Sequence, residues 1–370
     1  MKLPRAVVLL SFVSFLNDLA SDIVVPLIPI LLATVLAAGP VVLGLVEGVA
    51  DAVASLLKLW AGRHSDVLTS RRKPLTVIGY SISNVARPLL GLATGWPTVV
   101  ALRSLDRVGK GIRSAPRDAM IADFTTIETR GYAFGFHRAF DNAGAVFGSL
   151  IAASILYWSG MSLQEVILWS AIPGLLAVGL LAFGVPAVKA QEPRPERIVL
   201  AKLSWRTLNP TTRRYLLVLP LFTFARASET FILLRGNEMR ISVVVLLLLW
   251  AAIAATKSTS ALLGGWLSDR IGRAPVMVSG WIVFGLAFFM IGQANSPAVL
   301  AITSLLFGLA MGFSEGAERA IISELASAQE QGTAFGWYHL MVGLAAIPAG
   351  LLFGIIWQWY GAAYAFGGLA

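Results

Sequence analysis

The stretch Gly62–Lys73, which reads GRHSDVLTSRRK, has a shorter second copy, GWLSDRIGR, at Gly265–Arg273. Each copy places an acidic residue, Asp66 or Asp269, beside a basic cluster, and each lies between two long apolar runs. A further segment recurs later in each half, RGYAFGF from Arg130 and QGTAFGW from Gln331. Such internal symmetry, joined to long apolar segments, indicates a duplicated membrane protein.

The composition also indicates a membrane protein. The chain is 57% hydrophobic and only 13% charged, and its mean hydropathy is +0.76. A soluble protein of 370 residues would need more charge to cover its surface. The net charge of +9 does not predict nucleic-acid binding, because the basic residues cluster at the ends of apolar runs. The absence of cysteine excludes disulfides, thiolate metal sites and a cysteine nucleophile.

The apolar runs have the length of transmembrane helices, about 20 residues. They predict spans at residues 5–37, 41–62, 74–95, 97–121, 131–158, 163–187, 214–235, 242–267, 275–295, 298–323 and 332–358. A twelfth helix begins near Gly361, and too few residues follow it to cross a bilayer, so we expect it to be incomplete in this chain. We predict an N-terminal six-helix bundle at 1–187, a cytoplasmic linker at 188–213 and a C-terminal helix bundle at 214–370.

The distribution of loop charges predicts the orientation. If the N-terminus is inside, the inner segments carry nearly all the loop Lys and Arg, and the outer segments carry only Arg235 and Arg240. The positive-inside rule then places the N-terminus in the cytoplasm. The first apolar run is too long for a cleaved signal peptide, so we expect a retained span. The basic, proline-containing linker is expected to include a short interfacial helix near residues 198–207.

The loop phrases resemble those of the major facilitator superfamily, and the resemblance covers essentially the whole chain. The segment around Asp66 is similar to that family's loop 2–3 motif, and the segment around Asp269 is similar to the repeat of this motif in the C-terminal half. RVGKG, from Arg107 to Gly111, is similar to the Arg-x-x-x-Gly motif of proton-coupled members. Closest in motif is the drug–proton antiporter branch, although the Gly-Pro pair of its fifth helix is replaced here by Gly144-Ala145. The resemblance implies an all-α membrane protein of two pseudo-symmetric six-helix bundles that works by alternating access.

The span at 97–121 carries a basic stripe. Its ionisable residues fall within an arc of about 140° when about 100° is allowed per residue, and they are Arg103, Asp106, Arg107, Lys110, Arg113, Arg117 and Asp118. A charge facing lipid at mid-span costs about 2.5–3.5 kcal/mol. The stripe is therefore predicted to face the protein interior. Arg107 and Lys110, near mid-span, are substrate or coupling candidates, and salt bridges are the structural alternative for the whole stripe.

Other intramembrane polar residues extend this candidate site. A carboxylate beside Pro26 and Pro29 in the first span could carry a proton, which makes Asp22 the leading coupling candidate. A histidine can change charge near neutral pH, although a packing role is the alternative for His137. The predicted substrate or coupling residues are Asn17, Asp22, Asp51, Arg107, Lys110, His137, Arg138, Asp141, Glu229, Glu315 and Glu318.

The charged residues at the cytoplasmic ends of the helices are predicted to form a conformational latch. Each motif aspartate is expected near the N-terminus of the fifth or the eleventh helix, where the helix dipole favours an anion. The predicted latch residues are Asp66, Arg71, Arg72, Arg117, Asp118, Asp123, Arg130, Asp269, Arg270 and Arg273.

Together these features predict a secondary active transporter that couples protons to the export of a small anionic, zwitterionic or amphipathic organic solute. The alternatives are an uptake symporter or uniporter of an organic anion or metal chelate, a lipid flippase, and a non-transporting sensor. No nucleophile–base constellation, metal-ligand spacing or phosphate loop is present in the sequence, so we expect neither an enzyme nor ATP-driven transport. We expect no cofactor beyond the coupling proton, and a monomer in a bacterial or archaeal inner membrane.

Overall fold

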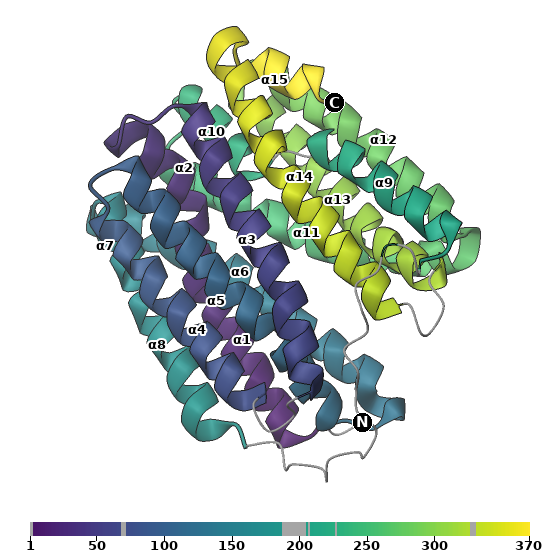
Figure 1. Cartoon of the computed structure of the whole chain (residues 1–370). Coiled ribbons are helices and arrows are strands. Elements are labelled where there is room, and N and C mark those ends of the chain that lie inside the picture. The colour runs from purple at the N-terminus through teal and green to yellow at the C-terminus, as the bar shows by residue number, and fades with distance from the viewer. Residues whose placement is uncertain (1–2, 68–71, 187–204, 206–207, 226–227, 326–330) are drawn as a thin grey trace. The chain divides into compact units, whose positions relative to one another are not determined.

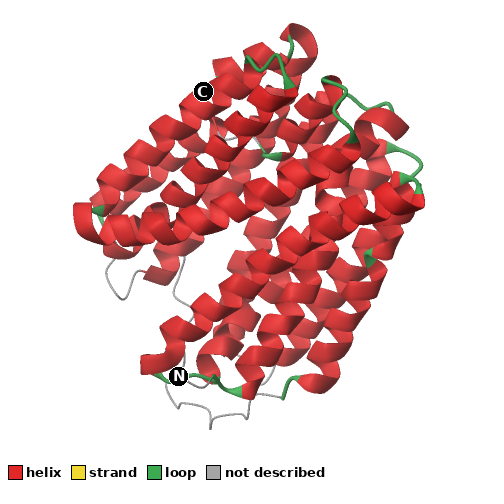
Figure 2. Cartoon of the chain, turned by 180° about the vertical axis from the view of Figure 1, so that it is seen from behind, coloured by secondary structure: helices red, strands yellow, loops and turns green. Residues whose placement is uncertain are grey.

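The structure is a computed structural model that describes residues 3–67, 72–186, 205, 208–225, 228–325 and 331–370. Throughout this described part the chain forms helices joined by short loops, and no strand occurs in it (Figure 2). Its contacts divide the chain into two compact units. Met1–Leu27 and Val49–Ala201 form unit 1, and Ile28–Gly48 and Lys202–Ala370 form unit 2. The domain limits expected from the sequence stay a prediction.

Unit 1 is built from the helices that carry most of the intramembrane charge. Its elements are α1 (Arg5–Val24), η1 (Val25–Leu27), the later part of α3 (Pro40–Val67), α4 (Arg72–Leu89), η4 (Leu90–Leu92), α5 (Trp96–Asp123), α6 (Ile127–Ser159), α7 (Leu163–Trp169), α8 (Ala171–Gly179) and η5 (Leu180–Gly184). In Figure 1, α1, α4, α5 and α6 run side by side, and α1 packs against each of the other three.

Unit 2 contains the remaining elements. These are α2 (Ile28–Ile30), η2 (Leu31–Val35), the start of α3, α9 (Pro210–Ala225), α10 (Thr230–Glu238), α11 (Val243–Ile271), α12 (Arg273–Gly292), α13 (Pro297–Leu325), α14 (Gln331–Tyr360) and α15 (Ala362–Gly368). The second copy of the loop motif contains Gly272, which has a φ of 95° and separates α11 from α12. An L side chain rarely adopts this backbone conformation, so glycine suits this junction.

Eight helices in the described part are long and apolar enough to cross a membrane. Three of the predicted spans do not meet this criterion, namely α4, α5 and the α9–α10 segment. Helices α4 and α5 fall outside it because they carry many ionisable residues. The charged side chains of these two helices therefore need polar or charged partners within the protein.

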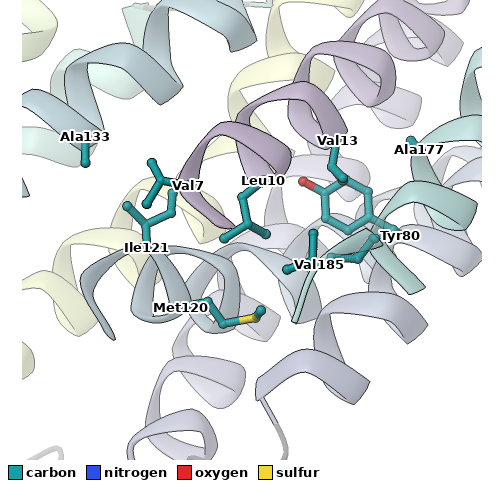
Figure 3. Close-up of a cluster of buried hydrophobic side chains, with 10 residues drawn as sticks. Val7, Leu10, Val13, Tyr80, Met120, Ile121, Ala133, Ala177 and Val185 are labelled. Atoms are coloured by element: carbon teal, nitrogen blue, oxygen red, sulfur yellow. The ribbon is translucent and has the colours of Figure 1, made fainter. Parts of the chain in front are cut away.

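The apolar core of unit 1 lies where α1, α4, α5, α6 and α8 meet. Figure 3 shows Leu10 and Val13 of α1 close to Tyr80 of α4, with Met120 of α5 nearby. All four of these side chains are fully buried. Only the hydroxyl group of Tyr80 is polar, and it reaches the charged network described below.

Two predicted spans are broken in the structure. The expected helix at 163–187 divides at Ser170, whose hydroxyl donates to the carbonyl oxygen of Ile167 at 2.7 Å. The expected helix at 214–235 divides between Ala225 and Thr230, where the Ser228 hydroxyl accepts from the Thr230 amide at 3.4 Å. Leu163–Gly184 remains one candidate span, so the span predicted there is confirmed and only its helix is interrupted. The prediction of a continuous helix at 214–235 was wrong. Serine hydroxyls compete with helical backbone hydrogen bonds at both places.

The first span follows the chain as expected but changes its helix type at the prolines. Pro26 lies in the 3-10 segment η1, and Pro29 lies in the single turn α2 before the π-helical segment η2. Proline removes an amide donor and disturbs the helical ladder. The predicted interfacial helix near 198–207 lies almost wholly outside the described residues.

Candidate substrate and coupling site

Three arginines surround one buried aspartate in unit 1. The Asp106 carboxylate of α5 lies 2.8 Å from Arg87 Nε, 3.4 Å from Arg103 Nη1 and 3.8 Å from Arg107 Nε. Asp106 and Arg103 are each only 1% exposed. A buried ion pair is stable only when hydrogen bonds and opposite charges compensate for lost water. Asp106 thus offers one carboxylate to three guanidinium groups.

Asn17 of α1 joins this cluster to a second set of side chains. Its Oδ1 accepts from Arg87 Nη1 at 2.9 Å, from Arg113 Nη1 at 3.2 Å and from Asn84 Nδ2 at 3.2 Å. Its Nδ2 donates to the Asp18 carboxylate at 2.8 Å. The buried Asn17 amide thus fixes α1 against α4 and α5 by polar contacts. The structure places this predicted site residue at the centre of the network.

Lys110 lies one turn further along α5 and is only partly buried. Its ammonium group interacts electrostatically with Arg107, Lys58 and Arg113, and with one acid, Asp18. Among the described residues, Lys110 has no ion pair within hydrogen-bonding or salt-bridge distance. Lys110 is therefore a partly exposed cation among other cations.

A second polar cluster surrounds Asp141 of α6. Its carboxylate lies 3.6 Å from His137 Nε2 and 3.9 Å from both Arg117 Nη1 and Arg138 Nη1. Arg117 is held more closely by its neighbour Asp118, with Nη2 at 2.9 Å. The structure thus brings together three predicted coupling residues and two predicted latch residues at one place in unit 1.

Ser14 links the Asp141 cluster to the core. Its hydroxyl lies 3.0 Å from the Tyr80 hydroxyl and 3.3 Å from His137 Nε2, and it accepts from Arg117 Nη1 at 3.2 Å. The Arg113 guanidinium also lies over the Tyr80 ring, 4.4 Å from its centroid, in a cation–π contact.

Two other predicted residues of unit 1 are Asp22 and Asp51. Asp51 is exposed and Asp22 is partly buried. The main-chain oxygen of Asp22 accepts from the Ser149 hydroxyl at 3.4 Å. One turn earlier in α1, Asp18 accepts from Asn17 and so belongs to the charged network.

Unit 2 has its own intramembrane acids. The buried Glu318 carboxylate of α13 accepts from Trp281 Nε1 at 2.8 Å, and Trp281 stacks on Phe222 with centroids 4.1 Å apart. Glu229, at the break between α9 and α10, lies 3.5 Å from Lys257 of α11. The side chain of the predicted residue Glu315 lies outside the described part.

The predicted latch is visible only in part. Arg72 at the start of α4 pairs with Asp123 at the end of α5 at 2.5 Å. Arg270 lies over the Trp266 ring at 4.0 Å, and Arg273 is partly buried at the start of α12. The side chains that the structure does not describe are those of Asp66, Arg71, Arg130 and Asp269. The contacts expected for the motif aspartates therefore stay a prediction.

The sequence analysis missed several residues of the network as site residues, among them Ser14 of α1. Asp18, Tyr80, Asn84 and Arg87 take part in it, and the last three line one face of α4 at helical spacing. A polar stripe inside an otherwise apolar span was a signal available in the sequence. Among the residues the structure describes, no group of His, Asp or Glu could hold a metal ion.

Buried ionisable residues within membrane helices commonly mark substrate and ion pathways, as in transporters. A family model described as the Major Facilitator Superfamily matches residues 10–256 and 230–370. The chain belongs to this superfamily, which confirms the resemblance, the fold class and the expectation of a transporter and not an enzyme. It is thus an integral membrane protein.

Individual relatives agree with this assignment. An uncharacterized MFS-type transporter of Methanocaldococcus jannaschii is 32% identical over 363 residues, covering 96% of this chain and 89% of the relative. The multidrug resistance protein MdtH of Yersinia pestis is 24% identical over 343 residues, covering 90% of this chain and 82% of MdtH. The solved structure of the nucleoside transporter NupG has a TM-score of 0.76 at 14% identity, covering 99% and 96% of the two chains.

Proposed function

We propose that this protein is a proton-coupled secondary transporter of a small organic anion or zwitterion, working by alternating access. The observation that carries the proposal is the position of Lys110, which is partly buried, forms no salt bridge with the described residues and lies among the cations Arg107 and Arg113. Positive charges removed from water require opposite charge or polar partners. A carboxylate or phosphate group of a solute would supply this charge, and arginine can bind either with two parallel hydrogen bonds.

The test uses Lys110→Gln, which removes the ammonium group and keeps the length and polarity of the side chain. Arg214→Gln is the charge-matched control, because Arg214 is exposed at the start of α9. The probes are benzoate, glucose and tetraphenylphosphonium, an anion, a neutral solute and a cation. We expect benzoate to raise the melting temperature of wild type and of the control, but not of Lys110→Gln. Stabilisation by tetraphenylphosphonium alone, or equal stabilisation of both variants by benzoate, would contradict an anion site at Lys110.

Export by proton antiport is the leading direction. Its support is the motif similarity to the drug–proton antiporter branch and the similarity to MdtH, a protein described as a multidrug resistance protein. In antiport, substrate and proton bind in alternation, so binding of one must oppose binding of the other. A zwitterion meets this requirement if its cationic group displaces a proton from Asp18 or a neighbouring acid.

Symport of an anion with a proton is the second candidate, favoured by the mixed charges of the site. The cations that would bind the solute also interact with Asp18. An anion that occupied these cations would leave the carboxylates without compensation, and their protonation would then become more favourable. Proton and anion would bind together, as symport requires.

The number of protons bound or released when the solute binds distinguishes antiport from symport. Purified protein in weakly buffered solution is mixed with the solute that stabilises it, and the pH change is recorded with an indicator dye. We expect proton release for the antiporter and proton uptake for the symporter. Binding without any change in bound protons at any pH would contradict proton coupling in both forms.

A further inference from the structure

Arg117 of α5 lies between two acids of very different exposure. It pairs closely with Asp118, whose side chain is 48% exposed, and more distantly with Asp141, whose side chain is 8% exposed. Its Nε and Nη2 both lie 2.9 Å from Asp118 Oδ1, whereas its Nη1 lies 3.9 Å from Asp141 Oδ2. A small movement of the guanidinium group would exchange one carboxylate for the other. The geometry is that of a side chain with two alternative partners.

Asp141 is left with distant partners in this arrangement. None of its neighbours His137, Arg117 and Arg138 comes closer than 3.6 Å, and Asp141 Oδ1 is buried without a hydrogen-bond partner in the described part of the chain. An ionised carboxylate in such a place has lost water and gained no close donor. A proton on this carboxylate removes the charge and so removes the cost.

The charged groups around Asp141 come from each helix that surrounds it. Asp18 of α1 interacts with it electrostatically and adds a like charge. Helix α5 contributes Arg117 and Asp118, and α6 contributes His137 and Arg138. From α4 the Tyr80 hydroxyl reaches the cluster through Ser14. The second acid and the loosely held arginine make the charge on Asp141 sensitive to the position of Arg117.

Ser14 supports the exchange of partners by Arg117. Its fully buried hydroxyl accepts from Arg117 Nη1 and also lies within hydrogen-bond distance of His137 Nε2 and Tyr80. These contacts give the guanidinium group a fixed polar anchor that does not depend on which carboxylate it pairs with.

We propose that Asp141 binds the coupled proton and that Arg117 controls this binding by pairing with either Asp118 or Asp141. This inference rests on the proposed proton coupling, and it replaces Asp22 as the coupling carboxylate. When Arg117 pairs with Asp118, a proton from water binds to the Asp141 carboxylate and gives the neutral acid. When Arg117 moves to Asp141, its positive charge favours the carboxylate, and the proton returns to water. Arg117 acts here as a positioning residue for the proton site.

The test measures the carboxylic acid C=O band by infrared difference spectroscopy during a pH titration of protein in liposomes. We expect wild type to show a band that disappears in Asp141→Asn. Asp141→Glu keeps a carboxyl group and should shift the band in frequency, which guards against loss by misfolding. Glu165→Gln is the matched control, because Glu165 is an exposed acid in the capping box of α7 and lies outside both clusters. A band unchanged in Asp141→Asn would overturn the proposal.

Asp118→Asn tests the role of Arg117 separately. Without the Asp118 charge, Arg117 should pair with Asp141, and its positive charge should then weaken the acid band at a given pH. Arg117→Gln removes the positive charge and should have the opposite effect, a stronger acid band at a given pH. If the Arg117–Asp118 pair has only a structural role, both variants should change the melting temperature and leave the pH dependence of the acid band unchanged. That result would refute the proposal that Arg117 controls proton binding.

These spectra do not require a transported solute, so they separate this inference from the proposed function. Counterflow of labelled benzoate at equal pH on both sides tests transport without a proton gradient. If benzoate is not transported while the band behaves as expected, the solute class is wrong and the proton site stands. If counterflow is retained in Asp141→Asn but a pH gradient no longer drives accumulation, both proposals are supported. Full gradient-driven accumulation by Asp141→Asn would reject Asp141 as the proton carrier.

Discussion

At the residue scale, Asp106 is the side chain on which the buried charge of unit 1 most depends. It compensates Arg87 and Arg103 at 2.8 and 3.4 Å, and all three are buried. Removing one partner from a buried pair leaves an uncompensated charge, which costs about 3–5 kcal/mol. We therefore expect Asp106→Asn to lower the melting temperature strongly, as measured by fluorescence scanning in detergent.

The Asp123→Asn variant provides the comparison. Asp123 also pairs with an arginine, Arg72, but its side chain is 26% exposed. Exposed pairs contribute about 0–1 kcal/mol, so this variant should melt close to wild type. Equal losses for the two variants would mean that burial does not set the strength of these pairs.

At the element scale, the packing of α3 against α14 in unit 2 depends on small residues. A Cβ atom at Gly48 would lie 2.8 Å from the carbonyl oxygen of Ala346, and one at Gly354 would lie 2.6 Å from that of Pro40. Contacts this short force the backbones apart, since carbonyl groups within helices cannot move aside. Interfaces between membrane helices commonly use small residues for such close approach.

We therefore expect Gly48→Leu to separate the start of α3 from α14 and to change transport. Gly265→Leu in α11 is the control, because no atom lies within 4 Å of a Cβ built at Gly265. The measurement is the rate of solute counterflow together with the melting temperature. If Gly48→Leu and Gly265→Leu both keep the wild-type counterflow rate and melting temperature, transport does not depend on the close approach of α3 and α14.

At the scale of the whole molecule, the orientation in the membrane can be tested directly because the chain contains no cysteine. Single cysteines can be introduced at Thr126, in the loop before α6, and at Asn295, in the loop before α13. The predicted topology places Thr126 in the cytoplasm and Asn295 outside. We expect an impermeant maleimide to label the Asn295→Cys variant in intact cells, and the Thr126→Cys variant only in inverted vesicles. The reverse pattern would overturn the topology.

The sequence alone determined the fold class of this protein. A bilayer requires long apolar helices with internally satisfied backbones, and this requirement is visible in composition and periodicity. The duplicated motifs at Asp66 and Asp269, together with RVGKG from Arg107, then indicated the family. The spacing along α5 indicated which residues share a face. The sequence did not determine where the helices are interrupted. Hydroxyl groups such as those of Ser170 and Ser228 either break a helix or are accommodated in it, and their surroundings decide which.

Only the tertiary structure decided which charges meet. The sequence offered Asp22 as the coupling acid, since prolines follow it in the same span. The structure places Asp18 and Asp141 in the arginine network, and it holds Arg117 between Asp118 and Asp141. These partners come from different helices, and small differences in rotation decide which side chain reaches which. Local spacing fixes the face of one helix, whereas electrostatic partners depend on how neighbouring helices pack.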